Sequence, residues 1–432
     1  MPVRGRVGVL IALAVATAAG QVANAQEAGP VDLFDTTRAN REGGLLADAA
    51  SLGMAPGTVG SVAFFDLSPA GNRSLRSGGL NRRMRVALPD GGSVTCNLAP
   101  TGRQNDVEIL NGSLGDGDGA DHCYLLVKDG RVTGDIQTAS GRYRIVPAGR
   151  GDTHAVVEIR DQAFPEEGDI VEPPVPKRGS RSSARDEPLC DVAGAGDRGT
   201  IDLMVLYTPA AAAKSDMDVM VAEAINQLQT AVAQQQGENF GVKIRLVHSQ
   251  QVDYVEGDDI GVDLDRLSGA EPGYLDEVPA LRDKYKADIV HLIIDGKLDA
   301  CGLGWMIEPG YDDSADYAFS VSERVCAVDN YSLAHEVGHN IGMNHDRYVV
   351  DGADADAINF GYVSVETGKR TLMAYDQKCR DAGTDCPRIL TYSTPAPVMG
   401  GSTAWGVPPA RGDGAYNREV LCRNTPGVSR YR

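Results

Sequence analysis

The chain has 432 residues and a formal net charge of −19 at pH 7. Its composition, with 42% hydrophobic and 23% charged residues, is typical of a globular protein that is long enough for two domains. The acidic balance argues against nucleic acid or an anionic membrane as the main partner. We therefore expect neither of these partners, and we expect a monomer.

The first 25 residues have the pattern of a secretory signal peptide. Two arginines precede an apolar run at residues 7–19, and the small residues 23–25 form a cleavage site. The apolar run is too short, and wrongly flanked, for a stable membrane anchor. We expect removal of this peptide and secretion to the extracellular space or the periplasm.

Residues 26–170 are predicted to form a small antiparallel β domain. Short β-rich runs between residues 58 and 161 are separated by turns that contain glycine, and residues 142–145 alternate polar with apolar side chains. His122 and His154 are isolated in this region, and we interpret them as ordinary surface or turn histidines. No catalytic group is expected here.

Residues 171–189 are predicted to form a linker. Proline stiffens the first half, and the second half consists of Ser, Gly and Arg with nothing apolar to bury. Exposed basic residues in such a segment are ready cleavage sites. The residues alone leave two alternatives: an activation loop that follows a propeptide, or the basic hinge of a permanent two-domain protein.

Beyond residue 190 the pattern changes to strands that alternate with helices. This alternation predicts an α/β fold with a mixed, largely parallel sheet covered by helices. The expected elements are a strand at residues 201–207, a helix from Thr208 to Gly237, a strand at 242–247, a helix at 273–285, a strand at 289–294 and a short edge strand at 316–321.

A His-Glu-x-x-His motif begins at His335 and predicts a metal site. On a helix, residues i and i+4 share a face, so His335 and His339 present two imidazoles to one point. Gly342 is expected to end this active-site helix with a positive φ, and the turn brings His345 back as a third nitrogen. Glu336 is the next residue of the helix after His335, and it lies beside the fourth coordination position of the metal, which the three histidines leave open. Together these residues predict a catalytic site for one zinc ion.

These motifs resemble the metzincin clan of zinc endopeptidases. Asp346 directly follows the third histidine, and in this feature the sequence resembles the reprolysin (adamalysin) branch, in particular its secreted bacterial members. Met373 lies in a short apolar turn, as the long form of the motif requires. Tyr375 follows two residues later, and this spacing differs from the reprolysin pattern. It resembles that of the astacin and serralysin branches, where the tyrosine binds or approaches the zinc. The resemblance covers roughly residues 199 to 401 and includes residues 201–208, 301–304 and 361–362.

The resemblance implies a secreted zinc-dependent endopeptidase that acts on proteins or peptides and is made as a zymogen. Glu336 would be the general base toward water and then the proton donor to the leaving amine. For Tyr375 two roles remain open, a hydrogen bond to the oxyanion or simple packing below the site. Met373 would form an apolar floor, and Asp346 would orient the framework through hydrogen bonds. The substrate would lie antiparallel along the edge strand.

The domain assignment follows from these expectations. We assign residues 1–25 to a signal peptide, 26–170 to a β-rich propeptide that inhibits its own enzyme, 171–189 to a linker with the activating cleavage, and 190–432 to a zinc metalloprotease domain. We expect the propeptide to cover the cleft without contacting the metal, and the cut to fall between Lys177 and Arg185.

The eight cysteines predict disulfides in an exported chain. Both halves of the chain hold even numbers, and a sequence alone does not fix the connectivity. The plausible pairs are Cys96 with Cys123, Cys190 with Cys422, Cys301 with Cys326, and Cys379 with Cys386. With this pairing, the mature enzyme retains Cys190.

Two other functions compete with the endopeptidase. A non-catalytic, zinc-stabilised secreted binding protein would need no base, so Glu336 argues against it. A zinc hydrolase of non-protein amides is opposed only by the expected edge strand. Calcium is a further possibility without support, because the acidic stretches 116–118 and 351–356 do not follow the EF-hand ligand order.

Overall fold

The computed structural model describes residues 29–40, 49–77, 82–114, 121–149, 151–173, 190, 196–233, 241–269, 271–308, 314–398, 401–409 and 412–432. The signal peptide expected at residues 1–25 lies outside the described residues. So do Lys177 and Arg185 in the linker, Gly237 as the expected helix end, and the acidic stretch 116–118.

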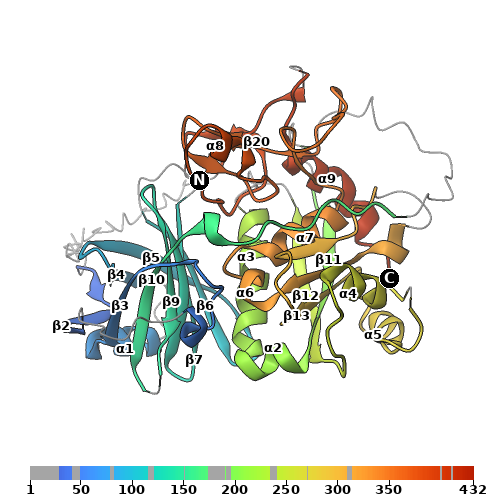
Figure 1. Ribbon diagram of the computed structural model, residues 1–432. Helices are drawn as coiled ribbons and strands as arrows, with labels where there is room; N and C mark the ends of the chain where they lie inside the picture. The colour runs from blue at the N-terminus through green and yellow to red at the C-terminus, as the bar shows by residue number, and fades with distance from the viewer. Residues whose placement is uncertain are drawn as a thin grey trace, which may run out of the picture.

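The N-terminal part (residues 29–173) contains one ten-stranded sheet in the order β1-β4-β5-β6-β7-β8-β9-β10-β3-β2 (Figure 1). All neighbours pair antiparallel except β1 and β4, as expected for a region of short strands and tight turns. The strands are β1 Val31–Asp32, β2 Phe34–Asn40, β3 Val59–Leu67, β4 Arg82–Ala87, β5 Ser93–Gln104, β6 Val107–Ser113, β7 His122–Lys128, β8 Arg131–Gln137, β9 Arg142–Pro147 and β10 Thr153–Ile159, and one short helix, α1 Pro69–Arg76, follows β3.

The interpretation of His122 and His154 as surface or turn histidines is wrong. Both side chains are buried. The His122 Nε2 lies 2.8 Å from the Asp135 carboxylate, and the His154 Nε2 accepts a hydrogen bond from the Val132 backbone N–H at 2.9 Å. Each ring therefore has a polar partner that a local sequence pattern does not reveal.

The C-terminal part (residues 190–432) is built on a five-stranded sheet in the order β12-β11-β13-β15-β14. Its first four strands are parallel and β14 is antiparallel to β15, which gives the mixed, largely parallel sheet that the alternation predicted. The elements up to the active-site helix are β11 Gly199–Tyr207, α2 Pro209–Lys214, α3 Met217–Ala233, β12 Val242–Gln251, α4 Ile260–Leu267, α5 Val278–Tyr285, β13 Ile289–Ile294, β14 Gly302–Gly304, β15 Phe319–Glu323, α6 Arg324–Ala327 and α7 Ser332–Asn340.

Local signals at the start of this part act as expected. The Thr208 side chain accepts a hydrogen bond from the Ala211 N–H, and Pro209 occupies the first turn of α2. The helix expected from Thr208 onward is nevertheless two helices, because the chain is extended at Ser215 before α3 begins. Helix α4 was not expected.

The expected edge strand at residues 316–321 is a second error. The strand β15 lies between β13 and β14, so β14, with only three residues, is the edge. Two of the three residues of β14 are glycines. A run this short has too few side chains to produce a hydrophobic alternation.

After α7 the chain forms short elements above one end of the sheet (Figure 1, orange to red). They are β16 Asn344–Asp346, β17 Phe360–Gly361, β18 Val363–Ser364, β19 Lys369–Arg370, α8 Gln377–Asp381, β20 Thr394–Pro397, β21 Ala404–Trp405 and α9 Asn417–Val428. The four disulfides Cys96–Cys123, Cys190–Cys422, Cys301–Cys326 and Cys379–Cys386 confirm the plausible pairs. No helix of the described residues is both long and apolar enough to span a bilayer.

Candidate active site

Helix α7 and the turn that follows it bring three imidazoles together. His335 and His339 lie one turn apart on α7, and Gly342, with a φ of 100°, reverses the chain toward His345 on β16. The His339 Nε2 lies 3.1 Å from the His335 Nε2 and 3.0 Å from the His345 Nε2. All three rings are buried.

The second nitrogen of two of these rings fixes their orientation. The His335 Nδ1–H donates to the Leu372 carbonyl oxygen at 2.9 Å, and the His339 Nδ1–H donates to the Met343 carbonyl oxygen at 2.8 Å. Burial lowers the pKa of both rings, that of His339 to about 4, so they remain neutral. Burial also lowers the pKa of His345. The Nε2 lone pairs of His335 and His339 therefore face each other, and the His345 Nε2 lies beside them.

Zinc fits this arrangement. Three neutral nitrogens cannot satisfy one another without a cation among them, and they form the one such cluster of potential metal ligands among the described residues. Zinc–nitrogen bonds of about 2.0–2.1 Å in a tetrahedral site place two ligand atoms about 3.3 Å apart. The observed separations of 3.0 and 3.1 Å are close to that value.

Met373 and Asp346 pack around the triad. The Met373 sulfur lies so close to α7 that a Cβ at Gly338 would be 2.5 Å from it, which explains the glycine in the middle of the helix. The Asp346 carboxylate accepts hydrogen bonds from the backbone N–H of Tyr348 at 3.0 Å and of Tyr375 at 2.9 Å. Asp346 thereby connects the end of the His motif to the methionine turn.

Glu336 is buried beneath the edge strand β14. A Cβ at Gly302 would lie 2.6 Å from the Glu336 Oε1, and a Cβ at Gly304 would lie 3.1 Å from its Oε2. The two glycines therefore leave room for this carboxylate. Burial, and next the negative charge of Glu167, raise the pKa of Glu336 well above its ordinary value, whereas Arg388 opposes this shift.

Tyr375 lies beside the triad, with its ring centroid 4.2 Å from that of His345. Its hydroxyl donates to the backbone carbonyls of Glu167 at 2.9 Å and of Gly168 at 3.0 Å. Burial raises the pKa of Tyr375, so the hydroxyl keeps its proton. In the intact chain this hydroxyl is thus bound to the end of the N-terminal part.

Residues 166–171, the crossing segment, run along the edge strand. The Gly168 N–H donates to the Gly302 carbonyl at 2.7 Å, the Cys301 N–H donates to the Glu166 carbonyl at 2.9 Å, and Val171 forms a parallel bridge with Trp305. The crossing segment therefore runs parallel to β14. The family resemblance implies the opposite, antiparallel direction for a substrate.

Two acidic side chains of the crossing segment bind arginines of the C-terminal part. Glu167 is paired with Arg388, and Glu166 is paired with Arg380. Sequence reasoning missed these four residues. The available signals were a Glu-Glu pair just before the linker and an arginine, Arg388, in an otherwise apolar run.

Comparison with known proteins identifies the class of this site. Residues 197–386 match the model of the reprolysin metallopeptidases, Metallo-peptidase family M12. This match covers the triad, Glu336 and the methionine turn, and it confirms the resemblance to zinc metalloproteases of the reprolysin type. The chain is a zinc metalloendopeptidase.

The relatives are more particular. The chain is 28% identical over 355 residues to a peptidyl-Asp metalloendopeptidase of Stenotrophomonas maltophilia (strain K279a), covering 80% of this chain and 78% of that protein. It is 28% identical over 311 residues to a peptidyl-Asp metalloendopeptidase of Xanthomonas campestris pv. campestris, covering 71% and 69%. Metalloproteinase-II from Bacteroides fragilis, a solved structure, has a TM-score of 0.42 at 12% identity and covers 63% of this chain and 84% of that one.

Proposed function

We propose that the chain is a secreted zymogen whose mature form hydrolyses peptide bonds with one zinc ion held by His335, His339 and His345. The observation that carries this proposal is the convergence of three neutral Nε2 atoms beside the buried carboxylate of Glu336. Zinc in such a site lowers the pKa of water to about 7 and polarises the scissile carbonyl.

The chain's own residues supply the proton transfers. Glu336 accepts the proton of the attacking water and then donates it to the leaving amine. Its raised pKa favours this second step, because a carboxyl with a raised pKa holds a proton near neutral pH. Glu336 would nevertheless be ionised before attack, because the positive charge of a zinc ion bound by the three histidines opposes this rise in its pKa. Met373, Gly338 and Asp346 keep the imidazoles in place.

Tyr375 is proposed to act on the substrate once the crossing segment has left. In the intact chain its hydroxyl already donates to two backbone carbonyls beside the triad. A peptide that replaces the segment would present a carbonyl to the same hydroxyl. Donation to the oxyanion of the tetrahedral intermediate therefore fits its position better than packing alone.

The N-terminal part is proposed to be the inhibitory propeptide. The crossing segment forms main-chain hydrogen bonds with β14, the edge along which a substrate would bind by strand addition. The Glu167 carboxylate is not in the cluster of potential metal ligands, which supports inhibition without a bond to the metal. Cleavage between Lys177 and Arg185, with Cys190 retained through its bond to Cys422, would release this part.

Bonds to acidic residues are the proposed substrate class. Two relatives are named peptidyl-Asp metalloendopeptidases, and this chain places Arg388 next to its catalytic groups. Secretion is supported by the four disulfides, which form and persist in oxidising compartments.

The test is hydrolysis of unfolded casein after limited cleavage of the linker. We expect hydrolysis by the wild-type chain, and none after treatment with a chelator. His345→Ala should lower the zinc content measured after dialysis, whereas a surface variant such as Tyr348→Phe should retain one zinc per chain. A cut wild-type protein that binds zinc but hydrolyses neither casein nor peptides would contradict the proposal.

A further inference from the structure

Glu167 occupies a polar pocket of the C-terminal part. Its Oε1 accepts three hydrogen bonds: from the Arg388 Nη1 at 2.6 Å, from the Asn330 Nδ2 at 2.9 Å and from the Ser332 hydroxyl at 2.9 Å. The side chains of Glu167 and Arg388 are 0% and 3% exposed. Three donors on one oxygen make this a site built for an anion.

The pocket adjoins the catalytic groups. Ser332 is the first residue of α7, the helix that carries His335 and Glu336, and Asn330 lies two residues before it. The Tyr375 hydroxyl, beside the triad, donates to the Glu167 backbone carbonyl at 2.9 Å. A residue whose side chain enters this pocket therefore has its backbone beside the catalytic residues.

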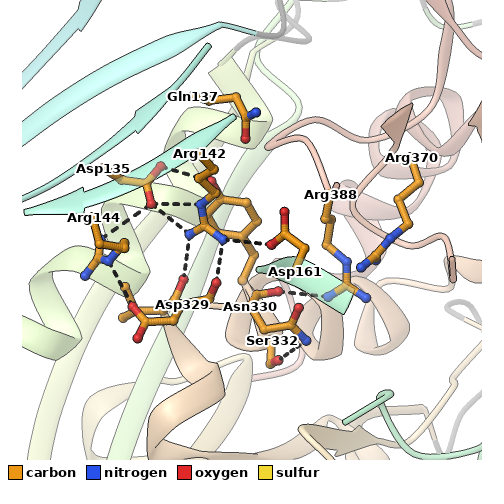
Figure 2. Close-up of polar contacts among 12 residues, drawn as sticks. Asp135, Gln137, Arg142, Arg144, Asp161, Asp329, Asn330, Ser332, Arg370 and Arg388 are labelled. Atoms are coloured by element: carbon orange, nitrogen blue, oxygen red, sulfur yellow. Dashed lines mark hydrogen bonds and ion pairs between the residues drawn. The ribbon is translucent and has the colours of Figure 1, made fainter. Parts of the chain in front are cut away.

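The positive charge of the pocket belongs to the C-terminal part, and its anions come from the N-terminal part. Arg370, a second buried arginine, lies beside Arg388, and Asp161 lies close to both (Figure 2). The Arg388 guanidinium is also fixed by donation to the Asn330 carbonyl at 2.8 Å. Departure of Glu167 and Asp161 would leave these arginines without those carboxylates. A desolvated charge without a counter-ion is costly, so the pocket favours a new anion.

We propose that Arg388, Asn330 and Ser332 form the specificity pocket for an acidic side chain of the substrate, and that Glu167 occupies this pocket in the uncut chain as a substrate mimic. This inference rests on the proposed endopeptidase function. Glu166 provides an internal comparison: its ion pair with Arg380 is 43% and 41% exposed, so it contributes little. Glu167 is thus the side chain through which the crossing segment fits the pocket.

The first experiment uses the wild-type chain after linker cleavage and pairs of peptides that differ only by Asp or Asn, and by Glu or Gln, at one position. We expect kcat/KM to favour the acid by roughly 10-fold or more, because the amide lacks the charge that Arg388 pairs with. In Arg388→Gln this ratio should fall toward one, while the zinc content stays at the wild-type level. If the ratio of kcat/KM values is unchanged in Arg388→Gln, or if the wild type shows no preference for the acidic peptide, the proposed specificity pocket is wrong.

The second experiment concerns the uncut chain, in which the linker residues Lys177, Arg178, Arg181 and Arg185 are replaced by Gln. Glu167→Gln should raise peptide hydrolysis by the uncut chain roughly 10-fold or more, and the matched Glu166→Gln should change it less than about 2-fold. Melting temperatures establish that both variants fold. Equal activity of the two variants would overturn the substrate mimic.

The outcomes of these experiments distinguish a failure of the pocket from a failure of the proposed endopeptidase function. If the cut wild-type protein hydrolyses no peptide at all, the proposed endopeptidase is wrong. If it hydrolyses peptides without regard to charge, the endopeptidase stands and the pocket is wrong. The peptide pairs require no substitution in the protein, so a variant that fails to fold does not prevent this decision.

Discussion

The N-terminal part contacts the C-terminal part in two regions that differ in kind. In the first, the face of the ten-stranded sheet meets α3 and the turn before α7, and ion pairs dominate. Arg142 bonds Asp135 at 2.8 Å within the sheet, and Arg144 reaches across to Asp329 at 2.9 Å (Figure 2). Arg144 also pairs with Glu223 of α3. All of these side chains are buried or nearly so.

In the second region, the crossing segment lies on β14, where backbone hydrogen bonds dominate. A single side chain, Glu167, enters the catalytic region, where it pairs with Arg388 and where groups of the same kind also lie close together. Three imidazoles face one another, and the carboxyl of Glu167 approaches that of Glu336.

We interpret the first region as the one that stabilises the contact between the two parts, and the second as the one that would block substrate binding. The first region contributes a broad, charge-balanced contact whose groups are polar enough to be solvated after separation. The second contributes few contacts but occupies β14, the proposed substrate edge. We expect losses in the first region to change the stability of the uncut chain, and losses in the second to change hydrolysis.

The largest effect expected in the second region is that of Glu336→Ala. Loss of the base should lower kcat by about 10²- to 10⁴-fold, because general acid–base catalysis contributes about that much. Zinc content, measured by metal analysis, should stay at the wild-type level, since the three histidines are intact. Near wild-type hydrolysis of casein by this variant would exclude Glu336 as the base.

Arg144→Ala addresses the first region. It leaves Glu223 and Asp329 without their shared guanidinium, and breaking a buried pair costs about 3–5 kcal/mol. Denaturant unfolding of the uncut chain should show a loss of that order, whereas the cut and separated enzyme should keep its kcat. Arg85→Ala, which breaks an exposed pair with Asp32, is the control and should cost less than about 1 kcal/mol. Equal losses for both variants would contradict the comparison.

Tyr375→Phe sharpens the description of the second region. If the hydroxyl serves the oxyanion, kcat should fall by roughly 10- to 1000-fold without loss of zinc. The substitution also removes the hydrogen bonds to the crossing segment, so the uncut chain should be inhibited somewhat less tightly. Unaltered kinetics in the cut enzyme would leave Tyr375 a packing role.

The smallest effect concerns His291, a buried imidazole outside both regions. Its two nitrogens lie 2.8 Å from the hydroxyls of Ser320 and Ser322, and burial lowers its pKa to about 3. The unfolded chain has a pKa near 6.5 and binds the proton first, so this stability is complete above that pH and is lost as the pH falls toward 3.

Between pH 7 and pH 5 the contribution of His291 amounts to about 2 kcal/mol. His291→Gln should remove this part of the pH dependence of the unfolding free energy. Unfolding curves at the two pH values, with the wild type as reference, measure it. An identical pH dependence in both proteins would mean that His291 can be protonated in the folded state.

The cluster of three histidines was predictable because its geometry is local. The spacing from His335 to His345 sets the ligand positions, and Gly342 needs only its own positive φ. The order of strands and helices likewise follows from periodicity. The roles of Glu336, Tyr375, Met373 and Asp346 remain predictions that their positions support.

The missed features depend on distant parts of the chain. Glu167 and Arg388 are 221 residues apart, and no local pattern links them. The edge strand β14 was misplaced because glycines, required by the approach to Glu336, erase its side-chain alternation. His122 and His154 were misjudged because their burial depends on neighbouring strands of the completed sheet.

The bridge between Cys190 and Cys422 has a consequence for the connectivity of the chain. It joins residues 232 positions apart and so closes almost the whole C-terminal part into a covalent ring, with the N-terminal part as a tail outside it. Ring closure of this length contributes on the order of 5 kcal/mol in the chain-entropy model. A cut in the tail releases the tail, whereas one cut inside the ring leaves both new ends attached. A molecule nicked once by another copy of itself would therefore stay in one piece.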